Sequence, residues 1–184
     1  QAVSAGSNAR AAQELSEKTL RLAQAVIADK SFSEVSGAAK SALAAAAGVL
    51  INRADPAAVA AFMTGAGNDL VRETGSVPLA RAVFGKLSDY TPEEKTAGKW
   101  RNALAVSMEA MFAGGADVPR QTAEKALGLY RQFASDQTLA GIEDAREIQS
   151  IVSGYADLVR LAASSGLVPA AAVSGSARLL AQYA

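Results

Sequence analysis

Histidine and cysteine are both absent from the 184 residues of this chain. Without cysteine there can be no disulfide framework and no thiolate metal site. Without histidine the chain lacks the commonest general base, the commonest metal ligand and the usual partner of a nucleophilic serine. The two absences argue against an enzyme, and we expect no catalytic residue, no cofactor and no metal site.

A charge excess and a long apolar run are missing as well. Eighteen basic residues balance eighteen acidic ones, and no expected helix face carries a dense row of lysine and arginine, so we expect no nucleic-acid partner. The longest apolar run covers residues 42–51, about half of the roughly twenty residues that a membrane-spanning helix needs. We therefore expect no membrane span.

The apolar residues that are present recur at helical spacing along nearly the whole chain. No segment shows sustained alternation or a short hairpin turn, so a sheet is not expected. The fold class predicted is all-α, a compact bundle of about six to eight helices in an orthogonal or up-down arrangement. The length favours one domain over residues 1–184, with a possible boundary near residues 88–92.

Start and stop signals divide the chain into segments. Capping-box spacing occurs at Ser31 with Glu34 and at Thr91 with Glu94, and predicts helices that begin there. Asp55 before Pro56 predicts another start, with Gly75 as its stop. The helix from Thr91 is expected to stop at Gly114 and Gly115. Further helices are expected over 76–87, from Asp117 and Pro119 onward, over about 142–166, and from Pro169 onward.

Seven of the expected helices have a named apolar face that is predicted to point into the core. In chain order, the faces are Leu15, Thr19, Leu22 and Val26; Val35, Ala39, Ala42, Ala46 and Val49; Val59, Phe62, Met63 and Leu70; Trp100, Leu104, Met108, Met111 and Phe112; Ala126, Tyr130 and Phe133; Ile148, Val152, Tyr155 and Val159; and Val173, Ala177 and Leu180.

The alanine-rich stretch "SALAAAAGVL" at 41–50 has two interpretations. Alanine is the best helix former, and small side chains let a second helix approach closely, which predicts a central core helix. A β-forming polyalanine block is the alternative, but the run has only four alanines inside a capped helical pattern. We expect the core helix.

Few residues offer a chemical site. Gly65 and Gly67 lack the spacing and the lysine of a phosphate loop and predict a loosened helix instead. Glu143, Asp144 and Glu147 could hold a cation, but carboxylates in a first helical turn also suit the helix dipole, which we favour. Serine and lysine lie close in sequence at Ser36, Lys40 and Ser41, as chance alone would place them.

Trp100 and Arg101 could anchor a partner, because both residue types are frequent at interface hot spots. Since Trp100 shares its stripe with Leu104 and Met108, we expect it in the core.

Alanine and serine dominate the chain while histidine and cysteine are missing, which is a silk-like composition, and the run "VSGAAKSAL" at 35–43 is echoed by "VSGSARLL" at 173–180. Two longer stretches, residues 99–163 with "KWRNALAVSMEAMFAGG", "TAEKALGLYRQF" and "AREIQSIVSGYADLVRLA", and residues 165–184, resemble the spider silk proteins, the spidroins. The first stretch resembles the last three helices of a spidroin N-terminal domain, and the second resembles the tail of a spidroin repeat unit. A charged, pyriform-like repeat unit fits best, and no functional residue is transferred.

The resemblance implies a non-enzymatic structural module of a secreted, extracellular fibre protein that associates with itself or with neighbouring copies. Shear or acidification should then convert a soluble helical form into assemblies. The chain begins at Gln1 without a basic-then-apolar leader, so we expect one module of a longer protein. The alternative is a helical protein–protein interaction module of a bacterial or phage protein, whose partner would contact Trp100 or Phe133.

Overall fold

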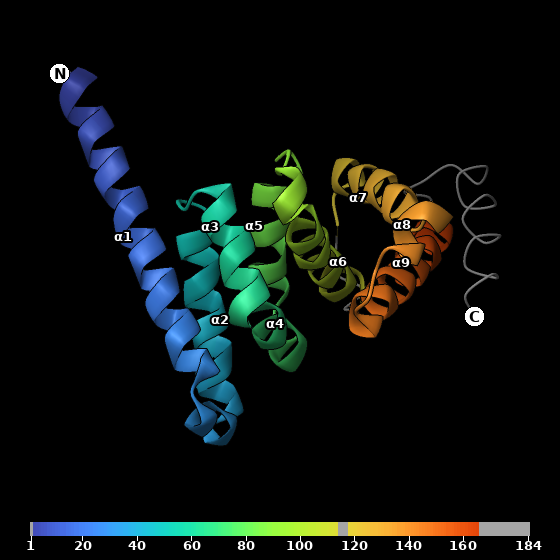
Figure 1. Ribbon diagram of the computed structural model, residues 1–184, viewed down its shortest axis with the longest axis horizontal. Coiled ribbons are helices and arrows are strands. Elements are labelled where there is room, and N and C mark those ends of the chain that lie inside the picture. Colours follow the sequence, from blue (N-terminus) through green and yellow to red (C-terminus); the bar gives the residue numbers. More distant parts are fainter. Residues whose placement is uncertain (1, 114–117, 166–184) are drawn as a thin grey trace. The chain divides into compact units, whose positions relative to one another are not determined.

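The computed structural model describes residues 2–113 and 118–165, and every regular element in these ranges is helical. The predicted all-α class is therefore confirmed. The helix predicted from Pro169 and the repeat-like tail lie outside the described residues. The α-helices, labelled in Figure 1, are α1 (Ala2–Ala28), α2 (Gly37–Ile51), α3 (Pro56–Phe62), α4 (Asn68–Thr74), α5 (Val77–Leu87), α6 (Ala97–Ala113), α7 (Arg120–Phe133), α8 (Asp136–Ala140) and α9 (Ala145–Ser165).

The chain divides into two compact units, Gln1–Ser107 and Met108–Ala184, and the division falls inside α6. The prediction of one domain over 1–184, with a possible boundary near residues 88–92, stays a prediction.

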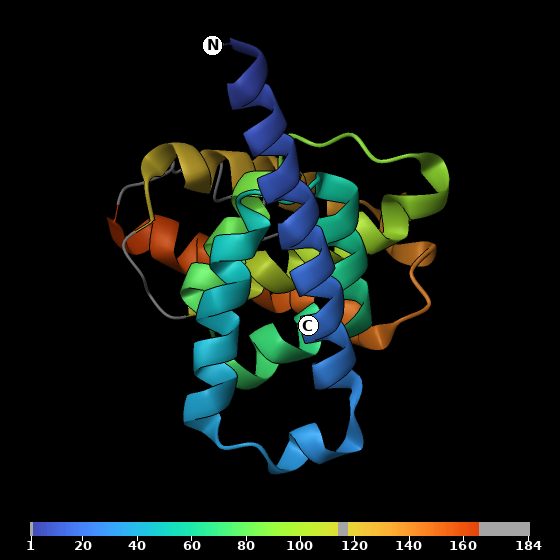
Figure 2. The same cartoon turned by 90° about the vertical axis from the view of Figure 1, so that its left-hand side faces the viewer.

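In the first unit, α2 packs against α5, α4 and α1. Helix α1 lies beside α2 and α3, and its N-terminal turns extend past the neighbouring helices (Figures 1 and 2). The core of the unit is formed by large apolar side chains from α1 to α6 and from the turn between α3 and α4, namely Leu20, Ile51, Val59, Phe62, Met63, Leu70, Leu79, Val83, Leu87 and Leu104.

The segment from Asp55 to Gly75 follows its sequence signals closely. The Asp55 carboxylate accepts a hydrogen bond of 2.8 Å from the Ala57 N–H, and Pro56 occupies the first turn of α3. Gly75 ends α4 in the left-handed region, at φ 58°, where a side chain would be strained. The predicted start, stop and buried face of this segment are all confirmed.

Between α3 and α4 the helix widens into a π-helical turn, Met63–Gly67. This is the loosened helix predicted from the two glycines. A side chain at Gly65 would collide with that of Gln24 from α1, and a Cβ at Gly67 would lie 2.7 Å from the Met63 sulfur. Both glycines therefore allow close packing, and neither belongs to a phosphate loop.

Helix α2 confirms the close approach predicted for the alanine-rich stretch, but on another face. A Cβ placed on Gly48 would lie 3.5 Å from the Leu79 Cα of α5. The residues facing the core are Ala44, Ala47, Gly48 and Ile51, whereas the predicted face (Val35, Ala39, Ala42, Ala46 and Val49) is exposed. The prediction of that face was wrong because small residues surround the helix, so periodicity did not single out one side.

Both capping-box predictions were wrong. Asp29, two residues before Ser31, accepts the Ser31 N–H at 2.9 Å and starts a short 3-10 turn, while Ser36 caps α2. In the second case the backbone is still extended at Glu93, with ψ 151°, so a 3-10 turn follows it and α6 begins only at Ala97. The spacing was present at both places, but a nearer cap or an extended residue moved the helix start.

In the second unit, α7 packs against α9 and α8. The predicted face of α7 is confirmed, because Ala126, Tyr130 and Phe133 are all buried. The Tyr130 ring stacks on Tyr155 of α9 with centroids 5.3 Å apart. The deepest apolar residues of α9 are Ile151, Tyr155 and Leu158, whereas Ile148, Val152 and Val159 of the predicted face are only partly buried.

Candidate association surface

Helix α1 carries a row of large apolar side chains that face solvent. Leu15, Leu22 and Val26 are 66%, 68% and 56% exposed, and are called the α1 stripe below. The prediction that they face the core was wrong. The buried side of α1 instead carries Ser16, Leu20 and Ala23. Helix α1 has two apolar sides, and only one of them is covered.

Polar side chains next to the α1 stripe form hydrogen bonds within α1 itself. The Thr19 hydroxyl donates to the Leu15 carbonyl and the Ser16 hydroxyl to the Ala12 carbonyl, each at 2.8 Å. Gln13 donates to Glu17 one turn on, at 3.0 Å, and pairs at this spacing stabilise a helix modestly. A partner that covers the stripe therefore does not have to supply hydrogen bonds to Thr19, Ser16 or Gln13.

Glu17 connects α1 to the start of α3. Its carboxylate accepts the Asp55 N–H at 3.3 Å and lies 4.0 Å from the Arg21 guanidinium. The hydrogen bond from Gln13 is the largest influence on its pKa, which is lowered from the ordinary value of 4.5, with the Asp55 N–H and Arg21 acting in the same direction. The charged form of Glu17 is thus favoured in the folded chain.

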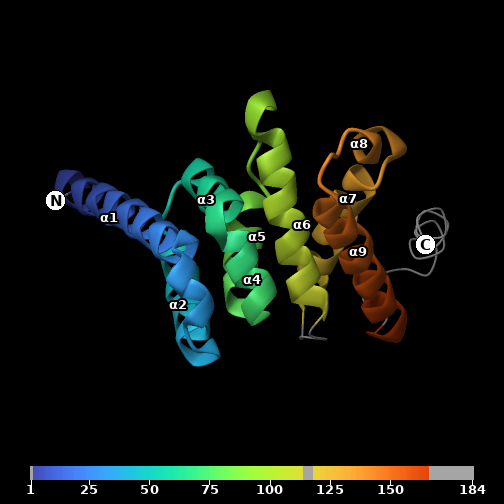
Figure 3. The same ribbon diagram turned by 60° about the horizontal axis from the view of Figure 1, so that its bottom comes forward.

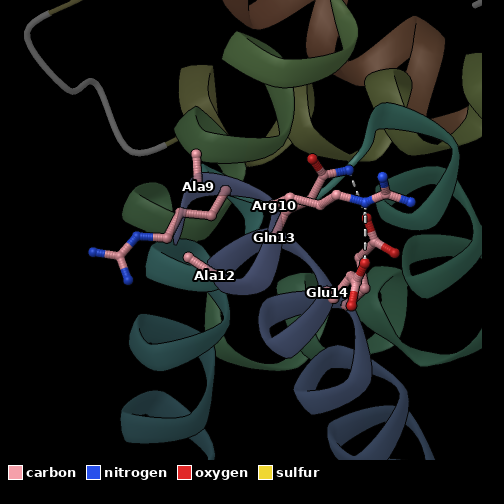
Figure 4. Close-up of a pocket in the computed structure, with 7 residues that line it drawn as sticks. Ala9, Arg10, Ala12, Gln13 and Glu14 are labelled. Carbon is pink, nitrogen blue, oxygen red and sulfur yellow. Dashed lines mark hydrogen bonds and ion pairs between the residues drawn. The ribbon is translucent and has the colours of Figure 1, made fainter. Parts of the chain in front are cut away.

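An open hollow of about 820 Å³ is lined by residues of α1, among them Arg10, Gln13 and Glu14 (Figure 4). Glu17 and Arg53 also line it. Two arginines and two glutamates line it; Arg10 donates to Glu14 at 3.3 Å, and the neutral Gln13 donates to Glu17. Such a mixed lining presents no excess of one charge with which to select an ionic ligand.

An exposed apolar residue also lies on α2. Val49 is 61% exposed and borders a shallow depression of about 450 Å³ that Val77 and Pro78 also line. Around it, α2 exposes mainly alanine, which offers less apolar area than leucine. The α1 stripe is therefore the stronger candidate for a contact surface.

The serine and lysine candidates have structural contacts. Ser36 accepts the Ala39 N–H and so caps α2. Lys40 lies 2.8 Å from Glu73 of α4 and 5.2 Å from the centre of the Phe32 ring. Lys40 therefore links α2 to its neighbours through an ion pair and a cation–π contact.

The three carboxylates at the start of α9 lie in different environments. Asp144 accepts the Arg146 N–H at 2.9 Å at the helix start, in agreement with the interpretation as a first-turn charge. Glu143 is exposed, whereas Glu147 is buried. Within residues 2–113 and 118–165, no group of three or more such residues is placed to hold a metal ion.

Trp100 lies in the core, as predicted. It is 9% exposed, and its indole N–H donates to the Leu87 carbonyl at 2.8 Å. Phe133 is 1% exposed. Both side chains therefore lie in the core rather than on a surface that a partner could contact directly.

The chain matches no known protein family, no curated protein and no solved structure. Across the part of the chain that the structure describes, no helix has both the length and the hydrophobicity of a membrane span.

The exposed stripe could have been noticed in the sequence from one signal. Leu20 and Ala23 form a second apolar row beside Leu15, Leu22 and Val26, so α1 has more apolar surface than one neighbouring layer covers. The sequence does not say which row is covered.

Proposed function

We propose that this chain is a non-enzymatic helical module that associates with further copies of itself through the α1 stripe. The observation that carries the proposal is the exposure of Leu15, Leu22 and Val26, each more than half exposed on one helix. Large apolar side chains in a row on one face are typical of a contact surface.

The size of the stripe sets the strength of this association. Burying each of the three side chains would contribute about 1 to 2 kcal/mol, less than full burial because each is already partly covered. One helix face also offers less area than the roughly 1,600 Å² of a standard stable interface. We therefore expect a weak, concentration-dependent complex of the isolated chain.

Weak contacts suit a module that is present in many linked copies. When two binding modules are joined, the second contact becomes intramolecular and the overall affinity rises by orders of magnitude. Together with the silk-like composition and resemblance, this supports a structural module of a secreted fibre protein. Neighbouring copies would then be the natural partners.

Sedimentation velocity over a range of concentrations tests the association. We expect the wild-type sedimentation coefficient to rise with concentration and Leu22→Glu to remain monomeric. Val49→Glu is the matched control, because Val49 is similarly exposed but lies on α2, and it should behave as wild type. A wild-type chain that stays monomeric up to millimolar concentration would contradict the proposal.

The fibre role is tested with a two-copy tandem chain, by circular dichroism and light scattering before and after shear or acidification. We expect assemblies to grow, and Leu22→Glu in both copies should suppress them. A tandem that stays monomeric and helical under both treatments would count against a fibre module. It would favour the alternative, an interaction module whose partner helix covers the same stripe.

A further inference from the structure

We propose that the α1 stripe is covered by α1 of a second copy, with the two helices antiparallel and crossing between Lys18 and Thr19. This inference rests on the proposed self-association and adds the orientation and register of the contact.

The spacing of the exposed residues is symmetric about that point. Leu15 and Leu22 lie equally far from it along the helix, and so do the exposed Ala11 and Val26. In an antiparallel pair, Leu15 of each copy therefore lies opposite Leu22 of the other, and Ala11 of each copy lies opposite Val26 of the other. The larger valine faces the smaller alanine, so that side chains can interdigitate. A two-fold axis through the contact closes the complex as a dimer.

The residue at the centre of the stripe is compatible with such a contact. Thr19 lies between Leu15 and Leu22 and is partly buried. Its hydroxyl is already bonded to the Leu15 carbonyl, so covering it leaves no unmet donor. Lys18 is exposed beside the axis, and its long side chain can extend into solvent.

Charges at the edge of the stripe complement each other in the same register. Glu14 and Arg21 are two turns apart on the flank next to Lys18, and their side chains are 57% and 74% exposed. In the antiparallel dimer, Glu14 of one copy lies within about 3 Å, measured along the axis, of Arg21 of the other. Two such opposite-charge pairs would form by symmetry, in exchange for the exposed contacts that Glu14 makes with Arg10 and Arg21 with Glu17 on their own helix, and would favour this orientation.

A parallel pair of α1 helices gives a different set of neighbours. Leu15 would then lie opposite Leu15, and Leu22 opposite Leu22. In the antiparallel register the two Leu15 residues are separated by about 10 Å along the axis, beyond the roughly 7 Å between Cα atoms that a disulfide can span. Disulfide formation therefore distinguishes the two arrangements.

The absence of native cysteine makes this experiment direct. Leu15→Cys and Leu22→Cys chains, one of them carrying a longer tag, are mixed in equal amounts and oxidised in a glutathione buffer. We expect the mixed disulfide, which joins one chain of each kind, to exceed clearly the half that random pairing gives. Val49→Cys, mixed with either chain, is the control and should show no preference. A predominance of like-with-like disulfides, or random pairing, would overturn the antiparallel register.

Charge exchange provides a second test that needs no cysteine. Glu14→Arg and Arg21→Glu should each weaken the dimer about threefold to tenfold, and the double variant should regain most of the wild-type affinity. Circular dichroism confirms that each variant keeps its helix content. If the double variant loses as much affinity as the two single variants together, the register is wrong.

The outcomes separate this inference from the proposed function. A chain that does not associate at all removes the proposed function and this inference together. A chain that associates, is dissociated by Leu22→Glu, but fails the disulfide and charge-exchange tests retains the proposed function and loses only the antiparallel register.

Discussion

Helices α7 and α1 both carry a regular apolar stripe, but the stripe of α7 is buried and the stripe of α1 is exposed. On α7, Ala126, Tyr130 and Phe133 are all buried. On α1, more than half of Leu15 and Leu22 is exposed. Helix α7 packs against α9 (Figure 3), and its Tyr130 stacks on Tyr155 there, whereas the packed side of α1 is the neighbouring row with Leu20. A periodic stripe thus identifies an apolar face, but not whether the chain supplies a neighbour for it.

The most direct test of this difference truncates one residue in each stripe. Phe133→Ala removes a buried ring and should lower the free energy of unfolding by about 3 to 5 kcal/mol. Leu22→Ala should change it by less than about 1 kcal/mol, because the side chain is largely exposed. Urea unfolding at low protein concentration, where the chain is monomeric, measures both. Equal losses would mean that α1 is packed on both sides.

A glycine pair tests how tightly α7 and α9 are packed. A Cβ on Gly154 would collide with the Tyr130 hydroxyl and lie 2.9 Å from the Glu109 Cα, so Gly154→Ala should cost about 1 to 3 kcal/mol. Gly128 on α7 has open space around it, so Gly128→Ala should instead stabilise by up to about 1 kcal/mol. Thermal unfolding compares them, and a tolerated Gly154→Ala would show that this contact is loose.

The Tyr130 hydroxyl is buried and has no hydrogen-bond partner among the described residues. Burial raises its pKa well above the ordinary 10.0, and the charges of Glu109 and Asp157 add to the effect. Its contribution to stability is therefore complete below pH 10 and is lost as the pH rises from 10 toward the folded pKa, because the unfolded chain releases the proton first.

Tyr130→Phe removes this hydroxyl and keeps the stacked ring. We expect the free energy of unfolding to stay equal or to rise by up to about 1 kcal/mol at pH 7. We also expect a weaker loss of stability above pH 10, measured by urea unfolding across the alkaline range. A clear destabilisation at pH 7 would show that the hydroxyl does have a partner.

The smallest expected effect concerns Glu17, whose hydrogen bond from the Asp55 N–H connects α1 to the start of α3. Because the pKa of Glu17 is lowered from 4.5, its contribution to stability is present above pH 4.5 and is lost as the pH falls through the folded pKa. Glu17→Gln should flatten the acid limb of the stability curve. Glu14→Gln is the comparison variant, since it removes the same charge from α1 without touching the hydrogen bond to Asp55. Identical acid limbs for wild type and Glu17→Gln would exclude this connection.

Local signals predicted some elements well and others wrongly. The Asp55 cap, the Gly75 stop and the loosened turn at Gly65 depend on backbone rules that act over a few residues, and all three are confirmed. The capping boxes at Ser31 and Thr91 failed because a second cap or an extended residue lay nearby. Local spacing is thus reliable where a single signal is present.

The helical class, the limits of the segment from Asp55 to Gly75 and the buried stripe of α7 follow from the sequence, because helix propensity, capping and the burial of aromatic rings favour one local answer. Which side of α1 and which side of α2 face the core follows from tertiary packing. Both helices have apolar or small residues on more than one side, so several orientations bury similar area. The choice follows from which surface fits the adjoining helices, such as Gly48 against Leu79, and that fit depends on residues distant in the chain.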